Sequence, residues 1–156
     1  MTSASSAGSL QSSLGYRFKA LALLEEALTH SSLVNEQKPA SPPHNERLEF
    51  LGDAVLSLVM SEYLASALPQ SSEGTLSKLK AKLVSEASLA QVARRLRLGE
   101  HLKLGRGEDR SKGHEKDSLL ADALEAVLAA VHLDGGFDAS RTVTRHIFAE
   151  ELTNIA

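Results

Sequence analysis

Two stretches of this chain are nearly continuous apolar runs, and each run is interrupted by a close pair of acids. They are "NERLEFLGDAVLSLVM" (residues 45–60) and "DSLLADALEAVLAAVHL" (residues 117–133). The pairs are Glu49 with Asp53 and Asp122 with Glu125. Spacings of three and four residues place side chains on one face of a helix. Because a buried carboxylate is costly unless it is paired or binds a cation, the fold must accommodate these acids.

If the two helices pack side by side, their four carboxylates converge and repel one another. Oxygen ligands without Cys or His suit Mg²⁺, for which Mn²⁺ can substitute. Gly52 weakens the first helix, and we interpret it as the point where another helix approaches closely. The alternative is that the acids border the apolar faces and point to water. A ferritin-like di-iron site is excluded, since no His in the chain has a Glu three positions before it.

The spacing of apolar residues is helical almost throughout, and alternating β-branched stretches are missing. We therefore predict one all-α domain. The expected helices cover residues 20–30, 46–67, 74–85, 86–98, 117–133 and 138–155, and the expected loops cover 35–44 and 99–116.

Length and composition fit one soluble domain of 156 residues. We expect a flexible N-terminus over residues 1–13 and a short tail over 153–156. There is no Cys, no signal peptide and no apolar run that approaches a membrane span, so we expect a cytoplasmic protein with no membrane contact.

Charge is distributed unevenly along the chain. Residues 78–116 hold eleven Lys and Arg against five Asp and Glu, while the remainder holds six against fifteen. This asymmetry favours one basic face and one acidic site. A set of solvated helix faces remains the alternative interpretation.

At this point the residues resemble a known family. The stretch "NERLEFLGDAVL" (45–56) is similar to the signature of ribonuclease III, an endonuclease that cuts double-stranded RNA. Further matching stretches follow in the right order over about residues 14–152: "LGYRF" (14–18), "ALTHSS" (27–32), "EGTLSKLKAKLVS" (73–85) and "DSLLADALEAVLAAVHLDGG" (117–136).

The resemblance implies a helical endonuclease domain over residues 14–152 that forms a two-fold homodimer. It implies Mg²⁺-dependent hydrolysis of double-stranded RNA, as in the processing of ribosomal RNA precursors, giving 5′-phosphate and 3′-hydroxyl ends. The implied metal ligands are the four acids already selected, with Asp53 and Glu125 as catalytic residues. Glu46 and Glu73 match further acids near the cleavage site, Glu46 being structural or dimer-related rather than a ligand.

Other roles carried by the resemblance concern the partner and the substrate. Phe50 matches an aromatic residue that inserts into the partner subunit, whereas it would be a simple core residue in a monomer. Plausible phosphate contacts are Lys78, Lys80, Lys82, Arg106, Arg110 and Lys112. Such enzymes read the A-form shape and the 2′-hydroxyls of RNA rather than its base sequence.

Family members usually continue into a double-stranded RNA-binding domain, and we expect this sequence to be either an isolated catalytic domain or a member that lacks the second domain. We expect weak RNA binding with a strong dependence on salt. Two alternatives stay open beside the nuclease: a catalytically silent RNA-binding module on the same scaffold, and a helical dimerisation module with no RNA role.

Overall fold

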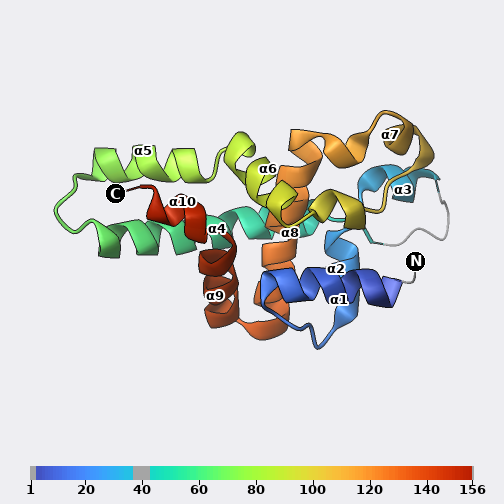
Figure 1. The fold of residues 1–156 in the computed structure, drawn as a ribbon, viewed down its shortest axis with the longest axis horizontal. Coiled ribbons are helices and arrows are strands. Elements are labelled where there is room, and N and C mark those ends of the chain that lie inside the picture. Colours follow the sequence, from blue (N-terminus) through green and yellow to red (C-terminus); the bar gives the residue numbers. More distant parts are fainter. Residues whose placement is uncertain (1–2, 37–42, 156) are drawn as a thin grey trace.

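Helix α8 (Asp117–Gly135) runs through the middle of the molecule, with other helices on several sides of it (Figure 1). Every residue from Ala123 to Val131 is buried. A helix that is apolar all round is stable only when other elements cover it. In the computed structural model this cover comes from α2, α4, α6 and α9. The second apolar stretch of the sequence is therefore the central core helix.

The structure describes residues 3–36 and 43–155, without the side chains of residues 3–6. Within these ranges the regular elements are helical, which confirms the prediction of an all-α domain. They are α1 (Ser3–Leu14), α2 (Leu21–Ala27), α3 (Ser31–Glu36), α4 (Glu46–Ala67), α5 (Glu73–Leu83), α6 (Glu86–Arg95), the 3₁₀ turn η1 (Leu98–His101), α7 (Arg106–Arg110), the 3₁₀ turn η2 (Gly113–Glu115), α8, α9 (Phe137–Ile147) and α10 (Ala149–Thr153).

Helix α4 begins and ends where the sequence predicts. Asn45 precedes it and is buried, and its side-chain amide donates to the carbonyl of Ala27 at 3.1 Å rather than capping the helix. The helix ends before Pro69, which cannot continue it. Helix α5 folds back along α4 (Figure 1), and Ser72 caps its start by accepting from the backbone N–H of Thr75.

Three regions differ from the sequence-based expectations. Residues 3–13, expected as a flexible terminus, form most of α1, in which Leu10 and Leu14 are fully buried in the core. The expected loop over residues 99–116 contains η1, α7 and η2. The expected last helix is divided at Phe148, whose side chain is fully buried.

The predicted proline-rich loop over residues 35–44 lies largely outside the described residues. Its first two residues, Asn35 and Glu36, belong instead to the end of α3.

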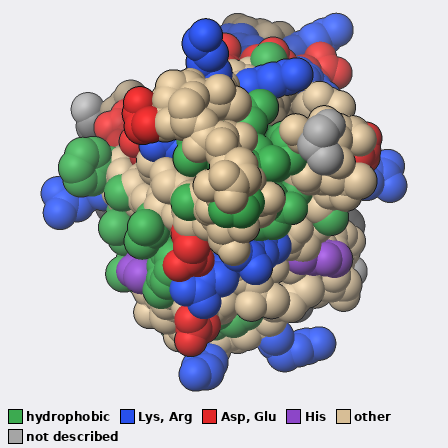
Figure 2. Space-filling view, turned by 90° about the vertical axis from the view of Figure 1, so that its left-hand side faces the viewer, with side chains coloured by type: hydrophobic (Ala, Val, Ile, Leu, Met, Phe, Trp, Pro, Cys, Tyr) green, Lys and Arg blue, Asp and Glu red, His purple; other side chains and the backbone are tan. Residues whose placement is uncertain are grey.

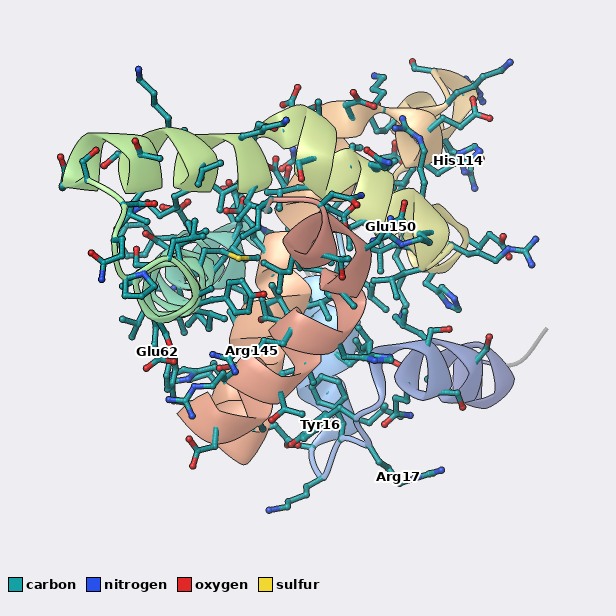
Figure 3. All side chains as sticks on the ribbon, turned by 60° about the vertical axis from the view of Figure 1, so that its left-hand side comes forward. Tyr16, Arg17, Glu62, His114, Arg145 and Glu150 are labelled. Carbon is teal, nitrogen blue, oxygen red and sulfur yellow. The ribbon has the colours of Figure 1, made fainter. Side chains whose placement is uncertain are left out.

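Hydrogen bonds to Asp134 link the end of α8 to the segment before α2. Its carboxylate accepts three hydrogen bonds: from the hydroxyl of Tyr16 at 2.6 Å, and from the backbone N–H groups of Lys19 and Ala20 at 2.9 and 2.8 Å. Figure 3 shows Tyr16 near the lower end of α9, where the chain turns out of α8. These bonds lower the pKa of Asp134, while burial and then the bond to Asp134 raise the pKa of Tyr16 to about 12.

Helix α4 is also long and apolar enough to cross a membrane, by length and composition alone, and it is the one described helix of which this is true. The prediction that no apolar stretch approaches a membrane span therefore needs correction. Because core helices pass the same test, this finding is weak evidence for a membrane. In this fold the buried side chains of α4 include Leu56, Val59 and Met60.

Candidate metal centre

The acids of α4 and α8 meet because the two helices touch at a glycine. A Cβ atom built on Gly52 would lie 1.8 Å from the carbonyl oxygen of Glu125 and 2.5 Å from its carbonyl carbon. Only a residue without a side chain permits this separation. The sequence-based interpretation of Gly52 as a point of close helix approach is confirmed.

The contact at Gly52 gathers carboxylates from both helices. One carboxylate oxygen each from Glu49, Asp122 and Glu125 lies within 4.8 Å of the other two. Asp53, one helical turn beyond Glu49, hydrogen-bonds to Glu125 through its side chain. The structure thus brings Glu49, Asp122 and Glu125 together, and it places Asp53 beside Glu125. Glu125 is the most deeply buried of them, with 8% of its surface exposed.

Burial and the closeness of the acids raise the pKa of three members of the cluster. Burial, then the hydrogen bond to Asp53, then the neighbouring charges raise the pKa of Glu125 to about 8. Burial and the charge of Asp122 raise the pKa of Glu49, and burial raises the pKa of Asp122. In the absence of a cation, Glu125 therefore holds a proton at neutral pH and donates it to Asp53.

This donor set fits a divalent cation with a preference for oxygen. The ligating atoms are carboxylate oxygens, which suit Mg²⁺ and Mn²⁺ rather than the softer transition metals. A cation would also stabilise the buried carboxylate of Glu125, whose pKa is raised by burial first and by the neighbouring charges in addition. Each carboxylate side chain is carried by a long, packed helix, so the ligands are already in position before a cation binds.

Further charged residues lie close enough to the cluster to affect the pKa values of its acids. Glu46 is exposed in the first turn of α4, and its charge contributes to raising the pKa of Glu49 and of Asp122. Glu86, at the start of α6, acts on Asp122 in the same direction, whereas His30 opposes the rise. Sequence reasoning selected neither Glu86 nor His30. Neither residue lies at helical spacing from the acid pairs, so the sequence held no signal for them beyond the "ALTHSS" stretch around His30.

Glu73 lies apart from this cluster within one chain. It is the first residue of α5, and it lines a hollow of about 270 Å³ with Ser61 and Ala65, in the C-terminal half of α4. Glu49 and Asp53 belong to the N-terminal half of the same helix. The chain alone therefore does not bring Glu73 to the four acids.

The remaining predicted residues are spread over the surface. Phe50 is 83% exposed, so it is not a core residue of this chain. Lys78 and Lys82 are exposed on α5, where Lys80 donates to the hydroxyl of Ser57 at 3.1 Å. The other cations are exposed in or just after α7, at the opposite end of the molecule (Figure 1): Arg106, Arg110 and Lys112.

Comparison with known proteins agrees with this geometry. The ribonuclease-III-like family matches residues 21–152. The chain is 54% identical over 141 residues to ribonuclease 3 of Heliobacterium modesticaldum, and 51% identical over 146 residues to ribonuclease 3 of Caldanaerobacter subterraneus. These alignments cover 90% and 94% of the chain, which spans 60% and 64% of the length of the two relatives.

A solved structure resembles the whole fold. It is the nuclease domain of ribonuclease III from Campylobacter jejuni, with 45% identity and a TM-score of 0.85 over 92% of this chain and 96% of the other. The family match, the level of identity and the shared fold agree, and the chain belongs to the ribonuclease-III-like family.

Proposed function

We propose that this chain is a Mg²⁺-dependent endoribonuclease that hydrolyses phosphodiester bonds of double-stranded RNA in the cytoplasm. The observation that carries the proposal is the convergence of Glu49, Asp122 and Glu125 across the α4–α8 contact. The similarity to bacterial ribonuclease 3 proteins gives this cluster its reaction class. Hydrolysis would leave 5′-phosphate and 3′-hydroxyl ends.

Within this proposal, the four acids have related tasks. Glu49, Asp53, Asp122 and Glu125 would hold Mg²⁺, which supplies the Lewis acidity that activates water and neutralises charge on the phosphate. Glu125 would release its proton when a cation binds, because the positive charge stabilises the buried carboxylate and offsets the neighbouring negative charges. The buried position of Glu125 keeps its carboxylate in a fixed orientation toward Asp53.

Exposed cations on α5 and α7 would contact the phosphates of the duplex. Lys78 and Arg110 are examples, and no ion pair with a carboxylate is found for either of them among the described residues. Contacts of this kind are sequence-independent and weaken steeply with salt. We infer that the isolated chain binds duplex RNA weakly and in a strongly salt-dependent way.

We infer in addition that the chain forms a two-fold homodimer through α4. Phe50, Ala54 and Leu58 are exposed and follow one another at intervals of four residues, so they form an apolar stripe along this helix. Figure 2 views the end of the molecule at which α4 turns into α5, and hydrophobic side chains reach its surface there. The related Campylobacter jejuni nuclease domain has been described as having a region involved in dimer formation.

A two-fold axis near Leu58 would account for the exposure of Phe50 and for the position of Glu73 apart from the acids of its own chain. The small residues Ser61 and Ala65 follow the stripe toward the C-terminal half of α4 and line the hollow beside Glu73. In an interface of this symmetry, the N-terminal half of one α4 faces the C-terminal half of the other. Phe50 would then enter the partner's hollow, and the partner's Glu73 would come close to the acid end of α4.

The nuclease proposal is tested by incubating a long RNA duplex with Mg²⁺ in low salt. Wild type should give short duplex products, whereas Glu125→Gln should give none, because the amide removes a ligand while keeping the shape of the side chain. A wild-type reaction with EDTA is the second control. Thermal melting of Glu125→Gln checks that the variant is folded.

The opposite outcome would identify the alternative. If the folded wild type binds the duplex but leaves it intact with Mg²⁺, the nuclease proposal is wrong and the catalytically silent RNA-binding module is supported. If the protein neither binds duplex nor gains thermal stability from Mg²⁺, the dimerisation module is supported instead.

A further inference from the structure

The backbone around His30 is tied directly to the acid end of α4. The backbone N–H of Asn45 donates to the carbonyl of Thr29 at 2.9 Å, and the side chain of Asn45 donates to the carbonyl of Ala27. Thr29 and Asn45 are both buried. Glu46 follows Asn45, and Glu49 follows one turn later. His30 directly follows Thr29 in the chain, and Thr29 bonds to the end of α4 that carries these acids.

The same segment is held on its other side by Lys103. The backbone N–H of Lys103 donates to the carbonyl of Leu28 at 2.8 Å, and the backbone N–H of His30 donates to the carbonyl of Lys103 at 3.0 Å. These bonds form the isolated bridge between Thr29 and Lys103. The Cα atom of His30 is thus fixed from two directions, independently of its side chain.

Hydrogen bonds to Ser32 determine the tautomer of the His30 ring. The backbone N–H of Ser32 donates to Nδ1 at 3.1 Å, and the hydroxyl of Ser32 lies 2.8 Å from the same atom. Because a backbone N–H can only donate, Nδ1 accepts the bond from Ser32, and the Ser32 hydroxyl, whose oxygen also accepts from the backbone N–H of Gly105 at 2.9 Å, then directs its hydrogen to Nδ1. Because Nδ1 is an acceptor, the neutral ring carries its hydrogen on Nε2.

Among the described residues, no hydrogen bond is found for the Nε2 atom of the His30 ring. In the ranges 3–36 and 43–155, the side-chain hydrogen bonds found for the His30 ring involve Nδ1 alone. The ring is half-buried and lies between charged groups on two sides. His30 opposes the burial that raises the pKa of Asp122, and it adds to the larger effect of Lys116 in lowering the pKa of Glu108.

We propose that His30 is a phosphate-binding residue of the acidic centre, and that its Nε2–H donates to a non-bridging phosphate oxygen of the RNA strand bound there. The proposal rests on the proposed nuclease function. Four converging carboxylates repel a phosphodiester, so a fixed donor at their edge would offset part of this repulsion. The bonds to Asn45, Lys103 and Ser32 place such a donor beforehand, without ordering a flexible side chain.

The test compares His30→Ala with His30→Gln, whose side-chain amide can return a donor to the Nε2 position. His146→Ala is the matched control, since His146 is exposed on α9 and bonds to the carbonyl of Ser13. For each variant, duplex affinity is measured with Ca²⁺ in place of Mg²⁺, KM and kcat are measured with Mg²⁺, and the melting temperature is measured with and without Mg²⁺ alone.

We expect His30→Ala to weaken duplex binding and raise KM about tenfold, as for the loss of one hydrogen bond to a charged group. His30→Gln should recover most of this loss, and His146→Ala should match wild type. The increase in melting temperature caused by Mg²⁺ should be the same in all four proteins, because the metal ligands are unchanged.

Three outcomes would overturn the proposal. Equal duplex affinity in wild type and His30→Ala would show that the donor does not contact RNA. A loss in His30→Gln as large as in His30→Ala, with an equal fall in melting temperature, would make His30 a structural residue. Loss of the Mg²⁺-dependent stabilisation would place its effect on the metal site. A wild type that neither binds nor cuts duplex would instead overturn the proposed function itself.

Discussion

Gly52 lies against the backbone carbonyl of Glu125, so close that a methyl group on Gly52 would occupy the position of that oxygen. The residue that carries the most buried acid of the cluster is therefore also the residue at which α4 and α8 touch. A change in the separation of the two helices moves Glu125 relative to Glu49 and Asp53, which are carried by α4.

Gly52→Ala is expected to destabilise the protein by about 3 kcal/mol, because the new Cβ meets backbone atoms that cannot rotate away. This outcome opposes helix propensity, which favours Ala over Gly by ~1 kcal/mol. Urea denaturation measures the difference. Gly74→Ala is the control, since its Cβ would meet nothing closer than 4.0 Å and it should be neutral or slightly stabilising. Wild-type stability in Gly52→Ala would contradict the close contact.

The metal-free protein should lose stability as pH rises from about 5 to about 8. The pKa of Glu125 rises on folding from 4.5 to about 8, mainly through burial, so in this interval the folded state binds a proton that the unfolded state has released. Stability must then fall with increasing pH. Urea midpoints in EDTA at pH 5 and pH 8 measure the fall, which should be smaller in Glu125→Gln. Identical pH dependence in the two proteins would show that Glu125 is ionised throughout.

Mg²⁺ should raise the melting temperature, and it should do so more at pH 8 than at pH 6. A cation that binds the folded state alone at 100 times its Kd adds about 2.7 kcal/mol. At the lower pH it must displace the proton of Glu125. Asp122→Asn should reduce the effect, whereas Asp138→Asn, at a site 93% exposed on α9, should not. A shift that survives in Asp122→Asn would place the cation elsewhere.

Removing the link between Tyr16 and Asp134 should destabilise the fold by about 1–2 kcal/mol, because the charged acceptor of three hydrogen bonds is lost. Asp134→Asn should also bring the pKa of Tyr16 down from about 12 toward its ordinary value of 10. Ultraviolet absorbance of the tyrosinate follows this titration, and Tyr16→Phe identifies which of the two tyrosines is responsible. An unchanged titration curve in Asp134→Asn would exclude the bond in solution.

Phe50→Glu should convert the proposed dimer into a monomer, since a charge cannot be buried in an apolar contact without a partner. Sedimentation velocity measures the mass of the particle. Leu133→Glu is matched to it, because Leu133 is also an exposed apolar residue, at 54%, but lies on α8 outside the proposed stripe. It should leave the mass unchanged. A dimer that persists in Phe50→Glu would place the interface on another face.

Sequence periodicity predicted the long helices well, since α4 and α8 bury continuous apolar surface that determines their extent. It failed for elements whose stability comes from elsewhere in the fold. Helix α7 is only Arg106–Arg110, and its first N–H groups are satisfied by the carboxylate of Glu36 from α3. Helix α1 is rich in Ser and Ala, and it is held by a few buried residues such as Leu10.

The convergence of acids from α4 and α8 could be predicted because each pair is local in sequence and lies on a strongly apolar helix that contributes to the core. The distances between pairs could not, because they depend on the α4–α8 contact. Glu73 shows the limit of this reasoning: it matches a family acid, yet its position apart from the cluster is a property of the tertiary structure. His30 and Glu86 were missed because their proximity to Asp122 arises from packing between elements distant in sequence.

Helix α8 provides both the central core and two of the four acids, and this has an evolutionary consequence. Substitutions among its buried small residues, such as Ala126 and Ala129, alter the helix packing and thereby the spacing of the carboxylates. A core substitution that leaves the protein folded could then still be selected against, because it changes which cation fits between the carboxylates. In proteins that descend from this chain, the residues of the α8 core would be as restricted in substitution as the acids of the cluster.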